Sequence, residues 1–363
     1  MPAPRPPPGR RLKIIIASTI VPFIEGGGTF IVDWLQVMLR RAGHEVEVFK
    51  IPFHSYWPEM YSQMLALRLF DLSAACDLLI TIRTPSYLLK HPNKVVWFIH
   101  HHRGAYDLWG TGYQDIPDTQ EGRRFRRALF ESDDLGLREC RRVFSNSQVV
   151  ADRLKNYNGI EAEVLYPPLF EPERYRSQGR GEAVLYASRL THHKRQHLAV
   201  EAMRHTRTAV RLVLAGAADT KEYLAELQDR VRRHGLESRV TISSGWVTEE
   251  EKVELTSKAL ACLYIPVDED SYGYPSLEAH HARKGVITCS DSGGTLELIE
   301  DGLNGFVVEP TPEALAAAMD RLYVDRELAR RMGEAGETQL ELLGVSWPHV
   351  VSRLTSTLPA VTR

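Results

Sequence analysis

The sequence predicts an α/β protein made of two doubly wound domains, each built on a parallel sheet. Short apolar runs alternate with helical patterns in two series, which meet at a break that starts with Pro167-Pro168. This alternation is typical of parallel sheets covered by helices. With 363 residues, of which 43% are hydrophobic, the chain is long enough for two cores. We expect a first domain at residues 1–170, a second at 171–345, and a last helix at 346–363 that packs back on the first domain.

The strands are expected where the apolar runs lie. The first series places them at residues 12–17, 45–50, 78–82, 95–100, 143–145 and 164–166. The second places them at 184–187, 211–215, 240–243, 261–265, 285–289 and 305–308. Ser147 and Ser346 are expected to cap helices. Because ligands bind beyond the carboxyl ends of such strands, polar residues that follow a strand are candidates for a site, and two facing domains would leave a cleft there.

Composition excludes several classes of protein. A formal net charge of -2 argues against bulk attraction to nucleic acid. No apolar run approaches the roughly 20 residues that cross a bilayer. The four cysteines form no close pair, so we expect neither a zinc site nor a disulfide framework, and we expect the reducing cytoplasm. The proline-rich leader, residues 1–9, is expected to be disordered, and the charged segment 171–181 to be a linker.

Residues 268–279, DEDSYGYPSLEA, are the most informative stretch. They place Asp270 and Glu278 around a Tyr-Gly-Tyr-Pro turn, which leads into a helix with Glu278 in its first turn. Carboxylates accept hydrogen bonds from sugar hydroxyls, and Gly273 lets the backbone approach a ligand closely. An ordinary turn before a helix with two solvated acids explains the same pattern.

Two cations follow the strand expected at 184–187. Arg189 and Lys194 can converge on a diphosphate, the arginine as a fork and the lysine as a point charge. Together they would offset the negative charge that grows when a phosphate departs. The ordinary interpretation is a pair of solvated surface residues.

Two glycine turns also stand between a strand and a helix. Gly27-Gly28 lie in the loop 25–29, and Gly293-Gly294 precede Glu297. Their amides suit a phosphate at a helix N-terminus. The loop 25–29 lacks the spacing of a dinucleotide fingerprint and the lysine of a P-loop, so neither of those sites is supported. Tight turns that need glycine are the alternative.

Three consecutive histidines, His100 to His102, end the strand expected at 95–100. Neighbouring residues on a strand end point in different directions, which is poor spacing for a metal cage, so we expect no metal site. One histidine that donates to a substrate hydroxyl is one interpretation, and a purely structural role is the other.

Taken together, these residues resemble the retaining glycosyltransferases of family 4, which have the GT-B architecture of two Rossmann-like domains. SRLTHHK resembles the family's Arg-Leu-x-x-x-Lys segment, and DSYGYPSLEA resembles its acid, seven residues, Glu signature. SGGTLELIEDGLNGFVV resembles its Gly-Gly-x-x-Glu and Asn-Gly-Phe run. The resemblance covers nearly the whole chain and is most specific in the second domain.

The resemblance implies a role for each matching residue. Arg189 and Lys194 would hold the donor diphosphate, Glu278 the ribose hydroxyls, and Asp270 the transferred sugar, while His100 would face the reacting sugar and the acceptor. The residues around the donor would be Gly27 and Gly28 over the diphosphate, Gly216 and Val247 near the base, Gly273 and Tyr274 against the sugar, and Gly293, Gly294 and Glu297 in the loop beyond it. No metal would be required.

The chain departs from the family pattern at three places. The first acid is usually Glu and here is Asp270, so Glu269 is the alternative residue for this role. His102 is likewise the alternative to His100. After Glu278 the chain reads His-His-Ala-Arg-Lys-Gly in place of the small residues that are usual there, and these bulky residues are expected to alter helix packing or to face solvent.

The function implied is transfer of a hexosyl group, with retained configuration, from a UDP- or GDP-sugar to a hydroxyl of a glycan, a lipid-linked acceptor or a small molecule. The context would be cell-surface polysaccharide or glycoconjugate synthesis. The alternatives are a non-catalytic sugar-nucleotide-binding protein and a sugar-nucleotide epimerase or phosphorylase of the same fold. A basic helical segment could meet an anionic membrane surface beside apolar neighbours, or be a solvated face; its arginines are Arg123, Arg124, Arg126 and Arg127.

Overall fold

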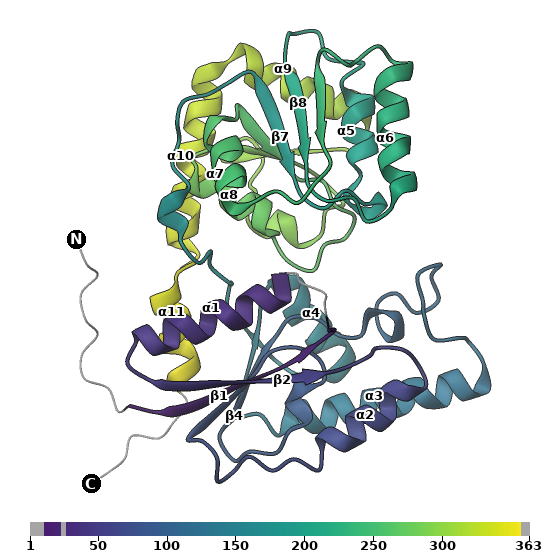
Figure 1. The fold of residues 1–363 in the computed structure, drawn as a ribbon, viewed down its shortest axis with the longest axis vertical. Coiled ribbons are helices and arrows are strands. Elements are labelled where there is room, and N and C mark those ends of the chain that lie inside the picture. Colours follow the sequence, from purple (N-terminus) through teal and green to yellow (C-terminus); the bar gives the residue numbers. More distant parts are fainter. Residues whose placement is uncertain (1–10, 23–26, 357–363) are drawn as a thin grey trace. The chain divides into compact units, whose positions relative to one another are not determined.

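The computed structural model describes residues 11–22 and 27–356, which form two compact units (Figure 1). Unit 1 comprises the described residues up to Pro167 and those from Ser346 onward, and unit 2 comprises Pro168–Val345. The leader 1–9, the loop residues Glu25 and Gly26, and the part of the expected last helix after residue 356 lie outside the described residues.

Unit 1 contains a sheet of six parallel strands in the order β2-β1-β3-β4-β5-β6. The strands are β1 Lys13–Ile20, β2 Glu45–Pro52, β3 Leu78–Thr81, β4 Lys94–Phe98, β5 Arg142–Ser145 and β6 Glu163–Val164. Every strand expected in the first series is present, with ends that differ by a few residues. The largest difference is β1, which continues to Ile20 because its last residues still pair with β2.

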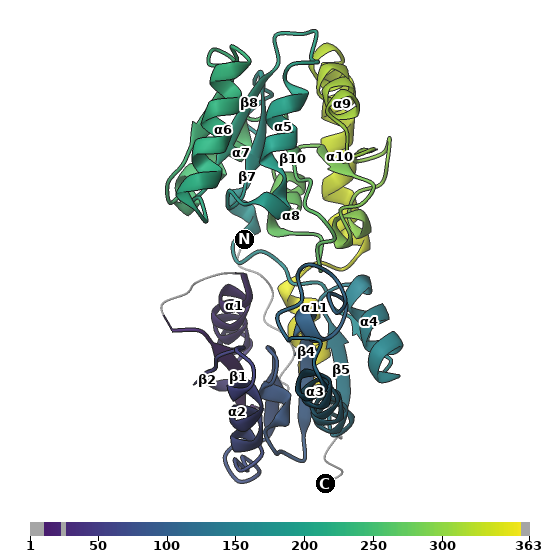
Figure 2. The same cartoon turned by 90° about the vertical axis from the view of Figure 1, so that its right-hand side faces the viewer.

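Among the described residues, five helices and two single turns complete unit 1. The helices are α1 Gly27–Arg41, α2 Glu59–Leu67, α3 Gln120–Arg138, α4 Gln148–Asn158 and α11 Trp347–Thr355, and the turns are η1 Ser86–Leu88 and η2 Arg103–Ala105. After β6 the chain continues into unit 2. In both views α1 lies on one side of the sheet and α2 on the other (Figure 1, Figure 2). Ser147 and Ser346 cap α4 and α11 with their side chains, as expected.

The last helix, α11, packs on unit 1. Arg353 donates two hydrogen bonds of 2.7 Å to the Glu163 carboxylate, and the rings of Trp347 and Trp97 meet edge to face. The helix therefore returns to the sheet whose last strand, β6, carries Glu163.

Unit 2 contains a second sheet of six parallel strands in the order β12-β11-β10-β7-β8-β9. The strands are β7 Ala183–Ala187, β8 Arg211–Ala215, β9 Val240–Ser243, β10 Ala261–Leu263, β11 Val286–Cys289 and β12 Gly305–Val308. The predicted fold of two doubly wound α/β domains is thus confirmed. The strand expected at 261–265 ends two residues early, so a longer loop leaves β10.

The helices of unit 2 are α5 Gln196–Ala202, α6 Lys221–Arg233, α7 Glu249–Lys258, α8 Tyr274–His281, α9 Pro312–Val324 and α10 Arg326–Leu342, with short turns η3 Pro172–Arg174, η4 His192–Lys194 and η5 Gly294–Glu297. Helices α5 and α6 lie on one face of the sheet, and α7 and α8 lie on the other (Figure 1). Thr248 and Glu251 form a capping box that starts α7.

One expectation about this unit needs correction. Segment 171–181 is not a fully solvated linker, because Tyr175 is buried and donates a hydrogen bond of 2.5 Å to Glu249. The bulky residues after Glu278 follow both expected alternatives: His280 is fully buried and its ring fills the space that Gly336 leaves on α10, whereas Arg283 is exposed.

Each sheet reverses its strand order at one point, between β1 and β3 in unit 1 and between β7 and β10 in unit 2. At such a reversal the two loops at the carboxyl ends leave in opposite directions, and ligands of open parallel sheets bind there. The fold therefore marks one candidate position in each unit.

Candidate active site

The reversal point of unit 2 carries the two cations expected from the sequence. Arg189 follows β7, Lys194 ends η4, and Glu269 lies in the loop after β10. Lys194 Nζ donates to the Tyr264 hydroxyl at 2.7 Å and forms an ion pair with the Glu269 carboxylate. Arg189 is two-thirds exposed and lies 3.2 Å from Asp219. One buried cation and one exposed cation thus stand beyond the carboxyl ends of β7 and β10.

Lys194 is 8% exposed, so its ammonium group is held in a largely dry environment. Burial lowers the pKa of Lys194, and the charge of Glu269 opposes that shift. An ammonium group has three N–H donors, of which Tyr264 and Glu269 engage two. With respect to the described residues, Lys194 therefore keeps one donor for an anionic ligand.

The first acid of the signature was left open between Asp270 and Glu269, and the structure brings Glu269 to Lys194. Asp270 is partly exposed at the neighbouring position. Glu269, which is also partly exposed, forms the ion pair with Lys194, and the charge of Asp270 acts on the same lysine.

The loops after β10 and β11 are joined through glycines. Gly294 N donates to Glu269 O at 2.7 Å, and a Cβ at Gly293 would lie 2.6 Å from both Glu269 N and Glu269 O. Gly293 has φ 61° and ψ -129°, a region that side chains other than glycine's essentially do not adopt. A Cβ at Gly294 would likewise collide with the Ser271 backbone. These glycines are therefore required for the approach of the two loops.

The other two glycines of the expected donor site also allow close packing. Gly273, with φ 71°, begins α8, and a Cβ there would lie 2.2 Å from the Tyr264 ring. Gly216 follows β8, and a Cβ there would lie 2.0 Å from Ser188 O. Tyr274 is the first residue of α8, and Glu297 ends η5 on the loop beyond β11.

Arg195 was missed by the sequence reasoning, although it follows Lys194 directly. Its guanidinium donates to Ile265 O and Pro266 O and forks onto both oxygens of Asp291, with distances of 2.7 to 2.8 Å. It has φ 56°, so the backbone reverses there and turns the side chain into the unit. Arg195 thus connects the loops after β10 and β11 to η4. The one sequence signal for this role is its position directly after Lys194.

Glu278 lies on α8, one turn inside the helix and not in its first turn as expected. It is 3% exposed, and its carboxylate lies 2.7 Å from Lys252 Nζ on α7. Burial raises the pKa of Glu278, and Lys252 opposes that shift. Lys252 in turn lies 2.9 Å from Glu249, which accepts the Tyr175 hydrogen bond. No sequence motif indicated this partner, because helices α7 and α8 meet only in the folded unit.

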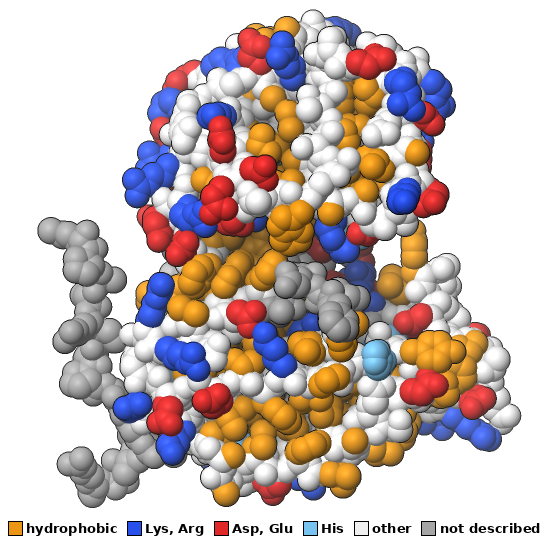
Figure 3. All heavy atoms as spheres, in the orientation of Figure 1, with side chains coloured by type: hydrophobic (Ala, Val, Ile, Leu, Met, Phe, Trp, Pro, Cys, Tyr) orange, Lys and Arg blue, Asp and Glu red, His pale blue; other side chains and the backbone are white. Residues whose placement is uncertain are grey.

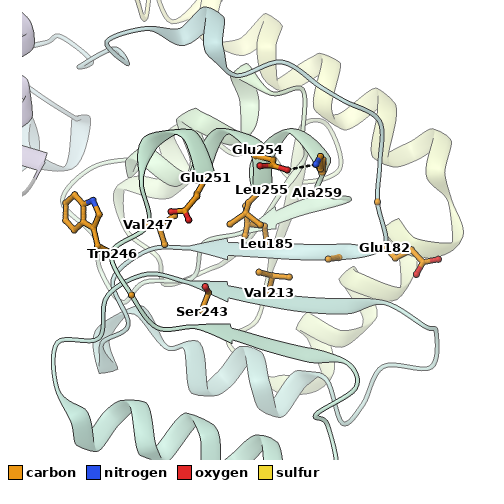
Figure 4. A pocket seen from close by; sticks show the side chains of 14 residues that line it. Glu182, Leu185, Val213, Ser243, Trp246, Val247, Glu251, Glu254, Leu255 and Ala259 are labelled. Carbon is orange, nitrogen blue, oxygen red and sulfur yellow. Dashed lines mark hydrogen bonds and ion pairs between the residues drawn. The ribbon is translucent and has the colours of Figure 1, made fainter.

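A cavity of about 430 Å³ runs along the sheet face beside α7 (Figure 4). Leu185 and Val213 line its floor, and Trp246 and Val247 stand at one end. Of the residues expected near the base, Val247 lines this cavity and Gly216 does not. Neither Lys194 nor Glu278 lines the cavity, so it is not part of the charged cluster.

In unit 1, β4 ends at Phe98, two residues earlier than expected, and the three histidines follow it in different environments. His101 is buried and bonds to Asn158 Oδ1 at 2.8 Å, and burial lowers its pKa to about 4. His102 Nε2 lies 3.0 Å from Asp115. His100 Nδ1 lies 2.6 Å from the carbonyl of His101, which can only accept, so Nδ1 carries a proton and Nε2 is the ring nitrogen left to contact a ligand.

The glycine pair Gly27-Gly28 opens α1, directly after the part of the loop that lies outside the described residues. Its backbone N–H groups are thus among the first of the helix, which have no partner within it. Among the described residues, no group of three or more His, Cys, Asp and Glu side chains could hold a metal ion.

The expected basic membrane face on α3 is only partly present. Arg126 donates to Ala105 O and stacks over two rings, and Arg123 pairs with Asp118 at 2.5 Å. Phe125 and Leu129, expected beside the arginines, are buried in the core because they lie on the opposite face of the helix. Arg124 and Arg127 are exposed. In the described part of the chain, no helix is long and apolar enough to cross a bilayer.

Two parallel six-stranded sheets, with paired cations and acids at the reversal point of the second, define the chain as a GT-B protein. Residues 170–339 match the family described as "Glycosyl transferases group 1". The match lies within unit 2, and the predicted resemblance to group 1 glycosyltransferases is confirmed by it and by the similarity to a hexosyltransferase described below.

Three relatives show the extent of the likeness. The human alpha-1,3/1,6-mannosyltransferase ALG2 is 28% identical over 338 residues, which cover 85% of this chain and 78% of the relative. A glycosyltransferase from Rickettsia africae has a TM-score of 0.71 at 18% identity, with 96% of this chain and 99% of that one covered. Anabaena Alr3699/HepE, solved with UDP, has a TM-score of 0.68 at 17% identity, with 95% and 99% covered. At these identities the two structures establish the fold alone.

Proposed function

We propose that the protein transfers a hexosyl group, with retained configuration, from a UDP- or GDP-sugar to a hydroxyl of a glycan, lipid-linked or small-molecule acceptor. The observation that carries this is the cluster at the reversal point of unit 2, where buried Lys194 and exposed Arg189 stand together with Glu269. The human relative is a mannosyltransferase and the Anabaena protein binds UDP, so GDP-mannose and UDP-glucose are the first donors to test. The context proposed is cell-surface polysaccharide or glycoconjugate synthesis.

The two cations divide the work on the diphosphate. Lys194 is fixed by Tyr264 and Glu269, so its remaining N–H can meet one phosphate without the entropy cost of ordering a free side chain. Arg189 is exposed and can close on a second phosphate as a fork. Both positive charges stabilise the negative charge of the departing diphosphate. The proposed reaction therefore contains no step that uses a metal ion.

The other residues would bind the sugar and the ribose. Glu278 accepts hydrogen bonds from the ribose hydroxyls with the carboxylate that Lys252 orients, and Asp270 takes hydroxyls of the transferred sugar. Gly273 and Tyr274 supply backbone amides at the start of α8, and Gly27 and Gly28 supply those at the start of α1.

The proposed reaction is a front-face displacement in which an oxygen of the departing diphosphate takes the proton of the acceptor hydroxyl. The sugar–oxygen bond to the diphosphate breaks as the bond to the acceptor oxygen forms on the same face, which retains configuration. His100 is the histidine proposed to face the reacting groups, because its Nε2 is left to contact a ligand while His102 is engaged by Asp115. No enzymic nucleophile is needed.

A donor screen tests this proposal. Thermal unfolding of the full chain is measured with a panel of nucleotide sugars, since a donor at 100 times its dissociation constant stabilises by about 2.7 kcal/mol. Arg189→Ala and Lys194→Ala should remove the stabilisation and the transfer activity, and Lys221→Ala, an exposed lysine at the start of α6, should change neither. Binding without turnover over a broad acceptor panel would instead favour a non-catalytic protein.

We also propose that the protein is a cytoplasmic enzyme that contacts the membrane surface peripherally. Besides Arg124 and Arg127, unit 1 exposes Leu65 and Leu69 on and just after α2, which packs on α3, and apolar side chains gather in this region in Figure 3. Flotation with anionic liposomes tests the contact: Arg124→Ala with Arg127→Ala should reduce binding, and equal flotation of the variant and the parent would end the idea.

A further inference from the structure

The reversal point of unit 1, between β1 and β3, carries its own polar group. Thr19 lies near the end of β1, and Arg83 and Thr84 follow β3. Arg83 Nη1 donates to Thr19 O at 3.3 Å, the Thr19 hydroxyl donates to Thr84 O at 2.7 Å, and the Thr84 hydroxyl donates to His100 O at 2.8 Å. These four residues, called the β1–β3 edge below, connect the ends of three neighbouring strands where a ligand of a parallel sheet is expected.

Arg83 is half-buried, and no carboxylate of the described residues pairs with it. Arg126, which also lacks such a partner, instead stacks over two aromatic rings. Lys94 is buried and lies 3.1 Å from Glu139. Arg153 lies 3.4 Å from Asp107. A half-buried cation without an opposite charge is unfavourable, so a negatively charged ligand at this edge would stabilise it.

The chemistry of the side chain indicates which ligand would supply the missing charge. Burial lowers the pKa of Arg83, and no neighbouring charge offsets the effect. Its single hydrogen bond to described residues, to Thr19 O, leaves the other N–H groups of the fork for a ligand. A guanidinium fork matches two oxygens of a phosphate, and that pairing is stronger than one with a neutral acceptor.

We propose that Arg83 binds a phosphate group carried by the acceptor. The acceptor is then a phosphorylated sugar or a lipid-linked glycan diphosphate, and not a neutral glycan. This inference rests on the proposed transferase function and adds the chemical class of its acceptor. The β1–β3 edge holds the phosphate at Arg83, while His100, bonded to the same edge through its carbonyl, stands beside the acceptor.

Equilibrium binding tests the proposal without turnover. Mannose 1-phosphate and mannose are titrated into the full chain at saturating UDP or GDP, so that the nucleotide occupies Arg189 and Lys194 and the probe cannot. The wild type should bind mannose 1-phosphate more tightly than mannose, and Arg83→Gln should weaken the binding of mannose 1-phosphate about tenfold or more. Arg141→Gln is the matched control, because Arg141 also donates to a backbone carbonyl, Pro92 O at 3.0 Å, but precedes β5 at the amino edge of the sheet.

Equal affinity of Arg83→Gln and the wild type for mannose 1-phosphate overturns the proposal. If Arg83→Gln fails to fold, Arg83→Lys is measured instead, because lysine keeps the positive charge but lacks the two parallel N–H donors of the guanidinium. A several-fold loss of affinity for mannose 1-phosphate then supports the proposal, and an unchanged affinity overturns it.

A second arm separates the two sources of the phosphate. If mannose 1-phosphate does not bind the wild type, the KM for a short-chain polyprenyl diphosphate glycan in detergent is measured instead. A rise of about tenfold in Arg83→Gln assigns the site to the lipid-linked acceptor, and no rise overturns the proposal. Failure of the transferase proposal is distinguished beforehand, because it would be seen as absence of stabilisation by any nucleotide or nucleotide sugar.

Discussion

Removal of Lys252 should destabilise unit 2 in a pH-dependent manner. Lys252 Nζ lies 2.7 Å from the Glu278 carboxylate, and the carboxylate side chain is 4% exposed. At that distance, with an effective dielectric constant of about 20, the attraction is about 6 kcal/mol. Desolvation of the two charges in the native protein offsets part of this attraction. Removal of one partner from such a buried pair therefore lowers the free energy of unfolding by about 3–5 kcal/mol. We therefore expect Lys252→Met to lose that amount at pH 7.

The sign of the pH dependence follows from Glu278. Without Lys252, burial alone raises the pKa of Glu278 in the folded state above its unfolded value near 4.5. The folded state then favours the protonated acid, so the variant is most stable below pH 4.5 and loses stability as the pH rises toward the folded pKa. The difference between the variant and the wild type should thus be smaller at pH 5 than at pH 8.

Urea unfolding of the full chain at pH 5 and pH 8, followed by fluorescence, measures this difference. The double variant Lys252→Met with Glu278→Gln should recover much of the loss, because it removes the uncompensated charge as well. A loss below about 1 kcal/mol at pH 7, or a loss that is equal at pH 5 and pH 8, would refute the reasoning about a buried pair.

Three further predictions concern other groups of the same unit. Burial lowers the pKa of His280 to about 3, so only the unfolded state takes up a proton there as the pH falls from 6.5 to 5. The free energy of unfolding of unit 2 should therefore fall by about 2 kcal/mol over this range. In His280→Leu, measured by urea unfolding, this pH-dependent decrease should be absent. Gly293→Ala should lower the free energy of unfolding by about 3 kcal/mol or more in the same assay, because the new Cβ would collide with the Glu269 backbone and the φ of this position is unfavourable for alanine. Gly302→Ala is the control: its φ is also positive, 76°, but a Cβ there has open space, so the cost should be about 1 kcal/mol. Glu269→Gln removes the charge that supports protonated Lys194, so the alkaline limit of kcat/KM should move to lower pH; an unchanged pH profile would contradict a Lys194–Glu269 pair in the working site.

The sequence by itself determined the class of fold and most strands. Alternation of apolar runs and helical patterns is a local property, and each run is short enough to be recognised without its partners. It also singled out Arg189 and Lys194 as cations that follow a strand, because in a parallel sheet every carboxyl end lies at the same edge.

Only the tertiary structure decided which charges meet. Glu269 forms the ion pair with Lys194, Lys252 lies against Glu278, and Arg195 forks onto Asp291. These pairs join residues from different helices and loops, so no spacing along the chain predicts them. Burial has the same character: Phe125 on α3 belongs to the core while Arg83 is half-buried without a carboxylate among the described residues. The free energy of a charge depends on its distance to other charges and to water, and both distances exist only after the sheets have formed.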